Sequence, residues 1–261
     1  MEVHAHTHTE RKKFKHYLWE FLMLFLAVFC GFLAENIREH KVEKDRAKEL
    51  AKSFYEELKG DSVNVVTKDQ YRIKQENALK YLMKYFKDSS LTTISKIFEL
   101  NFLYGISFRS PSLFEPRTVV LEQLKNSGSL RYFKNAELQK LIGDISIAIH
   151  NINDRQALES SVRIEYINPL IIRHYDYDFE SQLNQDGKVS VIKATGEYEK
   201  NNEFIPFQFK SMEKFDRQGT INALGFYCFN ILNSTRTLHF QKYIELNAAL
   251  LTQLRKEYHL K

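Results

Sequence analysis

The chain has 261 residues, of which only 9 are Gly and 4 are Pro, well below the roughly 12% that the two average together. Because Gly and Pro form turns, this shortage indicates long uninterrupted elements and argues against a β-sandwich, a barrel or a Gly-rich nucleotide-binding fold. Of the net charge of +5, residues 1–16 contribute +2. The remainder is too mild to indicate a nucleic-acid partner.

The most informative stretch is residues 17–34, YLWEFLMLFLAVFCGFLA, in which Glu20 is the only charge. As a helix it would be about 27 Å long, close to the roughly 30 Å of a bilayer's hydrocarbon core. We predict an uncleaved transmembrane helix. The alternatives are a cleaved signal peptide, for which Phe32 fits badly at −3 of a cut after Ala34, and a short buried core helix.

Tyr17 and Trp19 fall where interfacial aromatics occur, and Glu20 lies at the same edge of the span. We interpret Glu20 as an interfacial carboxylate rather than as part of an ion pathway, because it is not at mid-bilayer. A basic cluster precedes the span: Arg11, Lys12, Lys13 and Lys15. By the positive-inside rule, residues 1–16 form a cytoplasmic tail and the chain beyond residue 34 is exported.

After the span, the mostly charged residues 35–46 and the apolar stripe that begins at Ala47 predict a stalk helix over residues 35–60 that continues the membrane helix. Gly60 and Asp61 are its predicted stop and a new N-cap. Residues 61–261 are then one mostly helical domain. Apolar periodicity predicts helices over 61–87, 91–106 and 118–125, from Asn135 until Pro169, and from 217 through Leu232. A last helix carries Phe240 to Tyr258. Residues 107–117, which hold two of the prolines, are a predicted loop.

The helical period fails between residues 181 and 215. Val189 and Val191, and then Phe207 and Phe209, alternate as in short strands. We predict a small β-hairpin or an irregular insertion in a fold that is otherwise mostly α. This segment and the loop at 107–117 are where a functional surface would be sought.

The segment TVVLEQLKNSGSLRYFKNAEL, residues 118–138, contains a helix end at Ser127–Gly128, where Gly can adopt the left-handed backbone that closes a helix. Leu124 and Leu130 flank this turn. Arg131 follows it, and we interpret it as a structural cap that donates to helix-end carbonyls or to a carboxylate; a ligand-binding Arg is the alternative.

The N-terminal sequence HTHTERKKFKHYLWEFLMLFLAVFCGFLAENIREHKVEKDR, together with the LK-S-G-LR pattern of residues 124–131, resembles a group of single-pass membrane proteins of unknown role from Bacteroidota bacteria. The resemblance implies a bacterial inner-membrane protein with a periplasmic helical domain. It supplies no catalytic residues.

Two groups of residues could ligate a metal. His4, His6 and His8 alternate in the polar tail and could bind Zn, Ni or Cu, or remain solvated. His174, Asp176 and Asp178 would share one side of an extended chain and suit a divalent cation, or form a polar surface with the aromatics between them packed inward. We expect no cofactor.

No Walker loop, dinucleotide fingerprint, zinc-protease helix or nucleophile elbow is present in the sequence. Cys30 and Cys228 lie far apart in apolar runs, and we expect two buried thiols. The leading hypothesis is therefore a non-enzymatic interaction or scaffold protein, which contacts the bilayer and either another envelope protein or itself. The alternatives are an extracytoplasmic ligand sensor and an envelope hydrolase that uses Asp176 and Asp178.

Overall fold

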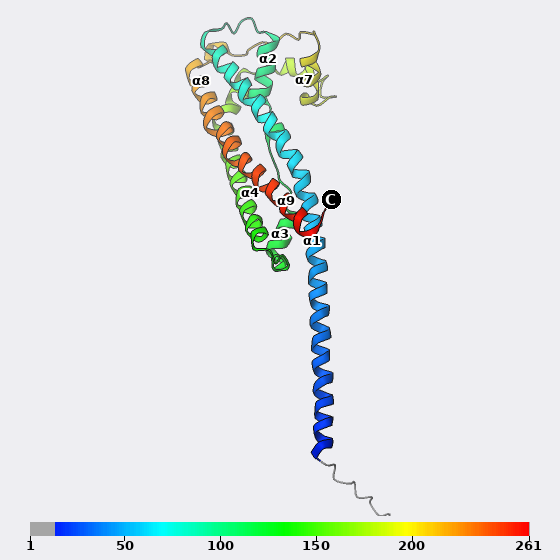
Figure 1. Cartoon of the computed structure of the whole chain (residues 1–261). Coiled ribbons are helices and arrows are strands. Elements are labelled where there is room, and N and C mark those ends of the chain that lie inside the picture. The colour runs from blue at the N-terminus through cyan, green and yellow to red at the C-terminus, as the bar shows by residue number, and fades with distance from the viewer. Residues whose placement is uncertain (1–13, 261) are drawn as a thin grey trace, which may run out of the picture. The chain divides into compact units, whose positions relative to one another are not determined.

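The computed structural model describes residues 14–260, and every regular element in that range is helical. The mostly α fold expected from the sequence is confirmed. The chain divides into an N-terminal unit, residues 1–50, and a compact helical domain, residues 51–261. Figure 1 shows the elements in chain order.

In the N-terminal unit, α1 (Phe14–Asp88) begins as a solvent-exposed apolar helix. The most apolar stretch of α1 has a mean hydropathy of 2.0, and none of its residues are buried. Among residues 14–260, α1 is the one helix long and apolar enough to cross a membrane. His16 Nε2 lies 3.3 Å from Glu20 Oε1. The carboxylate predicted at the edge of the span therefore has a partner one turn away on its own helix.

The helix end predicted at Gly60 is wrong, because α1 continues through Gly60 and Asp61 to Asp88. A Gly inside a helix costs only about 1 kcal/mol relative to Ala, and buried side chains on either side of it, such as Phe54 and Val65, outweigh that cost. A Cβ on Gly60 would lie 2.8 Å from Arg117 Nη1. The missing side chain therefore leaves room for a guanidinium. The compact domain begins at Ala51 rather than at Asp61.

Three long helical runs form the helical domain. The first is the part of α1 from residue 51 to residue 88. The second comprises α4 (Ala136–Val162), η4 (Arg163–Ile167) and α5 (Asn168–His174), and the third comprises α8 (Arg217–Gly225), η6 (Phe226–Asn233), η7 (Thr235–Phe240) and α9 (Gln241–Tyr258). In Figure 1 the second run, in green, lies beside the third, in orange to red, and α4 packs on α9.

Short elements connect the runs at their ends. They are α2 (Lys96–Phe102), η1 (Leu103–Ser107), η2 (Ser110–Ser112), α3 (Val119–Asn126), η3 (Ser129–Tyr132), α6 (Tyr177–Leu183), α7 (Val191–Lys200) and η5 (Met212–Lys214). The helix predicted over 91–106 begins later, at Lys96, because Ser95 accepts a hydrogen bond from the backbone N–H of Phe98 and caps it.

Asn135 opens the second run as predicted, since its side chain accepts a hydrogen bond from the N–H of Leu138 at 3.0 Å. The run does not end at Pro169, however, and continues to His174. The residues just before Pro169 form a wider π-helical stretch, η4. Pro169 itself lies in the first turn of α5, where the loss of a backbone N–H is tolerated.

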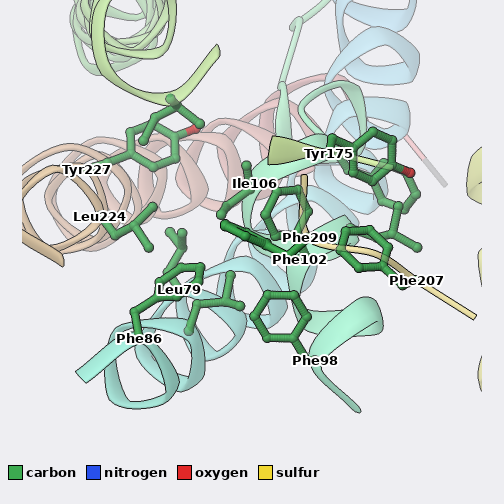
Figure 2. Close-up of a cluster of buried hydrophobic side chains, with 14 of the residues drawn as sticks. Leu79, Phe86, Phe98, Phe102, Ile106, Tyr175, Phe207, Phe209, Leu224 and Tyr227 are labelled. Atoms are coloured by element: carbon green, nitrogen blue, oxygen red, sulfur yellow. The ribbon is translucent and has the colours of Figure 1, made fainter. Parts of the chain in front are cut away.

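Aromatic side chains dominate the core where the short elements α2, α6 and α7 meet α1 (Figure 2). We call this group the aromatic cluster; its members are Phe86, Phe98, Phe102, Tyr175, Phe179, Phe207 and Phe209. The rings of Phe102 and Tyr175 stack at 5.6 Å between centroids, and Phe102 and Phe207 are 5.9 Å apart. Residues far apart in the sequence therefore share one core.

The β-hairpin predicted between residues 181 and 215 is wrong, because the segment holds the helices α7 and η5 between irregular stretches. Val191 begins α7 rather than a strand. Residues 202–210 have no regular secondary structure and pair with no strand in the described part of the chain. Phe207 and Phe209 alternate because both point into the aromatic cluster, which requires an extended backbone but no partner strand.

Candidate functional site

The histidines His4, His6 and His8 lie outside the described residues. His174, Asp176 and Asp178 are close in sequence, yet they do not converge on a common point. His174 ends α5 and is buried, and its ring stacks on Phe209 with centroids 5.0 Å apart. Its Nδ1 lies 2.9 Å from the carbonyl of Lys210, and the N–H of Lys210 donates back to the carbonyl of His174 at 3.1 Å.

Asp176 is also buried, and protein groups occupy both of its oxygens. Oδ1 accepts from the N–H of Asp178 as the N-cap of α6 and lies 3.0 Å from Lys210 Nζ. Oδ2 accepts from the N–H of Gln208 at 2.8 Å. The carboxylate of Asp178 is exposed and lies 3.6 Å from the same Lys210 Nζ.

The Lys210 ammonium therefore stands where a bound cation would be expected. Its hydrogen bond to Asp176 raises the pKa of Lys210 above its ordinary value. Among residues 14–260, no three His, Cys, Asp or Glu side chains are grouped closely enough to hold a metal ion. The contacts of His174 and Asp176 therefore fix residues 208–210 against the junction of α5 and α6, which is a structural role.

The turn at Ser127–Gly128 lies between α3 and η3. Gly128 has a φ of 68°, in the left-handed region, and Ser127 Oγ donates to the carbonyl of Gln123. Leu124 is fully buried and Leu130 is half-buried. Arg131 lies over the ring of its neighbour Tyr132, 5.2 Å from the ring centroid. The motif closes one helix and starts the next.

A buried ionic network, which the sequence analysis missed, joins the three helical runs. Arg72 on α1 donates to Glu159 Oε2 on α4 at 2.9 Å, and both side chains have no exposed surface. Tyr227 on η6 donates to Glu159 Oε1 at 3.3 Å and accepts from Arg163 at 3.2 Å. The guanidinium of Arg72 also lies over the ring of Phe240, 4.6 Å from its centroid.

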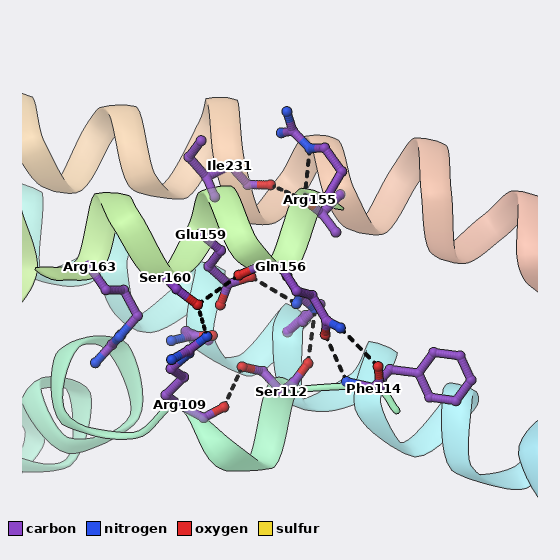
Figure 3. Close-up of polar contacts among 12 residues, drawn as sticks. Arg109, Ser112, Phe114, Arg155, Gln156, Glu159, Ser160, Arg163 and Ile231 are labelled. Atoms are coloured by element: carbon purple, nitrogen blue, oxygen red, sulfur yellow. Dashed lines mark hydrogen bonds and ion pairs between the residues drawn. The ribbon is translucent and has the colours of Figure 1, made fainter. Parts of the chain in front are cut away.

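The same side chains hold the predicted loop at 107–117 and the end of η1 before it in place. Arg72 donates to the carbonyl of Ser112 at 3.0 Å, and Arg163 donates to the carbonyl of Ile106 at 2.7 Å. Gln156 bonds both the N–H and the carbonyl of Phe114 at 2.9 Å, and Arg109 bonds Ser160 (Figure 3). The loop is therefore fixed to the core, and its polar partners are structural rather than exposed to a substrate.

A periodic signal could have revealed this network. The apolar face of α4 repeats at Leu138, Ile142, Ile145, Ile149 and Ile152. Continuing the same spacing places Gln156, Glu159 and Arg163 on the buried face. Polar residues at core positions indicate a buried polar network, because such groups are buried only when they are bonded. Their partners, up to 87 positions away in the sequence, could not have been read from the pattern.

The cysteines behave differently from each other. Burial raises the pKa of Cys228 to about 11, so its thiol stays protonated. Cys30 lies on the apolar span of α1, where no protein side chain covers it.

One surface feature of the helical domain could receive a side chain from another protein. A hollow of about 320 Å³ is lined by Tyr166, Gly219, Asn222, Ala223 and Phe226. Tyr166 and Phe226 are 46% and 45% exposed although they are aromatic, and Phe229, one turn beyond Phe226, is 52% exposed. Exposed aromatic side chains around a hollow are typical of a protein-binding surface. We call this group the apolar hollow.

No protein-family model, curated protein or solved structure matches the chain.

Proposed function

We propose that the protein is a single-pass protein of a bacterial inner membrane that presents its helical domain to another protein of the cell envelope. The apolar span of α1 is the proposed lipid contact. The basic cluster at residues 11–15 supports a cytoplasmic N-terminus and a periplasmic helical domain. The resemblance of residues 124–131 and of the N-terminal segment to Bacteroidota membrane proteins agrees with this location.

The apolar hollow is the observation that carries the binding role. Its rim exposes Tyr166 and Phe226, aromatic side chains that are enriched at the centres of protein interfaces. The Asp residues suggested for hydrolysis do not offer a comparable site, because Asp176 is buried and bonded on both oxygens. We therefore favour binding over catalysis, with a partner that inserts an apolar side chain into the hollow.

Site-specific photocrosslinking in intact cells tests this role. A photoreactive phenylalanine analogue at Phe226 should give one discrete product larger than the chain, and the same analogue at the similarly exposed Phe204 should not. Tyr166→Glu should abolish the product while leaving the protein folded, because a charge at the rim opposes apolar contact. Identical products from Phe226 and Phe204 would contradict the proposal, and a product of two copies of this chain would replace the envelope partner by self-association.

Reporter fusions test the topology separately. Alkaline phosphatase fused after residue 60 should be active, since it folds only after export, and a cytoplasmic reporter fused there should be inactive. The opposite pair of results would reverse the orientation.

A further inference from the structure

A second polar cluster lies away from the ionic network, where α7 packs against α2. Tyr198 on α7 is buried, and its hydroxyl donates to Glu99 Oε2 on α2 at 2.7 Å. The same hydroxyl accepts from the N–H of Ile205 at 3.2 Å. Glu99 is 1% exposed, and its other oxygen, Oε1, is buried without a hydrogen-bond partner among the described residues.

One turn before Glu99, Lys96 completes the contact between the two elements. Its ammonium donates to the carbonyls of Asn201 and Glu203 at 2.6 and 3.0 Å and lies 4.1 Å from the centroid of the Tyr198 ring. We call this group the α2–α7 clasp: Lys96, Glu99, Tyr198, Asn201, Glu203 and the N–H of Ile205.

The clasp covers one side of the aromatic cluster. Phe98, which neighbours Glu99, and Phe207, just beyond Ile205, have ring centroids 6.1 Å apart, and Phe179 lies 6.1 Å from Tyr198. If α7 and residues 201–205 moved away from α2, these rings would become accessible. The clasp is thus placed to control an apolar surface.

We propose that the α2–α7 clasp is a proton-controlled catch, closed over the aromatic cluster while Glu99 is protonated and weakened when Glu99 loses its proton. A proton on Oε1 removes the charge from the oxygen that has no donor, while Oε2 keeps its bond from Tyr198. An ionised Glu99 leaves a buried negative charge with one unsatisfied oxygen, which is costly in a protein interior.

The charges around Glu99 support a transition near neutral pH. Burial raises the pKa of Glu99 to about 7, and the hydrogen bond from Tyr198 and the charge of Lys96 offset this only in part. From the segment beyond α7, Glu203 faces Tyr198. On α7 itself, Glu199 binds Lys74 of α1 at 2.8 Å and Tyr104 of η1 at 2.8 Å.

The raised pKa of Glu99 determines whether the closed form gains or loses stability as the pH rises. The pKa of Glu99 in the closed clasp lies above its ordinary value of 4.5, so the closed form binds the proton more tightly than an opened form does. The contribution of Glu99 to closure is complete below pH 4.5, declines between pH 4.5 and 7, and is lost above pH 7. Opening should therefore increase on the order of 50-fold between pH 5 and pH 8.

Hydrogen exchange of the full chain in nanodiscs tests the catch. After correction for the intrinsic pH dependence of exchange, amides of residues 198–206 should lose protection as the pH rises from 5 to 8, whereas amides in the middle of α4 should not. In Glu99→Gln the protection of residues 198–206 should be nearly independent of pH. The matched control is Glu197→Gln on α7, an exposed carboxylate that pairs with Lys193, and it should keep the wild-type profile.

If Glu99→Gln folds poorly, Tyr198→Phe tests the same proposal. Tyr198→Phe removes the hydrogen bond that favours the ionised carboxylate, so the midpoint of the protection loss should move to higher pH. A wild-type profile without pH dependence, or the same dependence in wild type and Glu99→Gln, would overturn the proposal.

Discussion

Arg72, Arg163 and Glu159 place two positive charges and one negative charge inside the helical domain. Carbonyl oxygens of Ser112 and Ile106 accept from the two guanidinium groups and disperse the excess positive charge. Such a network is costly to assemble, and replacing it with apolar groups can even be neutral. Removing a single member has a larger effect, because it leaves the other charges buried without a partner.

We expect Arg72→Met to lower the free energy of unfolding by about 3–5 kcal/mol, as it leaves Glu159 Oε2 without its partner. The double variant Arg72→Met/Glu159→Met should cost less than the sum of the two single variants. Urea unfolding of the full chain in detergent, followed by circular dichroism, measures both. Lys140→Met is the control, since its pair with Asp144 is exposed and should contribute less than about 1 kcal/mol. Equal losses for Arg72→Met and Lys140→Met would contradict the expectation.

Two glycines that look alike in the sequence should respond oppositely to alanine. Gly128 has a φ of 68°, which an Ala side chain opposes, so Gly128→Ala should destabilise the protein by about 1–2 kcal/mol. Gly143 lies inside α4 with nothing within 4 Å of an added Cβ, so Gly143→Ala should stabilise by roughly 0.5–1 kcal/mol. Thermal unfolding of the two variants side by side gives the signs, and the same sign for both would contradict this account.

At the scale of elements, α1 caps α3 across the fold. Thr118 is at the N-cap position of α3, but its side chain makes no bond to the first turn. Glu57 Oε2 instead accepts from the N–H of Val120 at 3.1 Å, and Asp61 Oδ2 accepts from the N–H of Arg117 at 2.9 Å. Two carboxylates one turn apart on α1 therefore satisfy one donor in the first turn of α3 and one just before its N-cap.

Glu57→Ala should accordingly cost about 1–2 kcal/mol of stability, as the loss of an N-cap does. Thr118→Ala should change it by less than about 0.5 kcal/mol. Chemical unfolding of both variants tests the assignment. A larger loss for Thr118→Ala would assign the capping role to Thr118 instead of Glu57.

These cases show which elements the sequence could predict. Asn135 and Gly128 were predicted correctly because a helix cap depends on residues within one turn. The helix end predicted at Gly60 is wrong because the packing of α1 on the other helical runs outweighs the low helix propensity of Gly. The hairpin at 181–215 failed because the alternation of Phe207 and Phe209 reflects contact with the aromatic cluster, a tertiary effect that resembles a strand in sequence.

The candidate site was less predictable than the fold. His174, Asp176 and Asp178 formed a metal pattern in sequence, but Lys210 occupies the position of the cation, and nothing local identifies it as their partner. The apolar hollow combines Tyr166 with Phe226, which meet only after the second and third runs pack. The chemistry of such surfaces depends on contacts between segments distant in sequence.

At the scale of the whole molecule, the boundary of the helical domain determines which fragment folds. Phe54 and Tyr55 are each 1% exposed, and Leu58 is 3% exposed. Arg255 on α9 donates to the hydroxyl of Tyr55 at 2.7 Å, and Asn247 donates to the carbonyl of Leu58 at 3.0 Å. The part of α1 just before Gly60 is therefore core rather than stalk.

A fragment of residues 47–261 should unfold in one cooperative thermal transition, because it keeps all of these contacts. A fragment of residues 61–261 loses the burial of two aromatic side chains and one Leu, which at roughly 1.5–3 kcal/mol each amounts to about 5–9 kcal/mol. That loss is comparable to the whole stability of many domains, about 5–15 kcal/mol, so the shorter fragment should be largely unfolded or aggregated at 37 °C. Circular dichroism melting and gel filtration of the two fragments distinguish these outcomes. Equal melting temperatures would show that the domain begins at Asp61 and that residues 51–60 contribute nothing to its core.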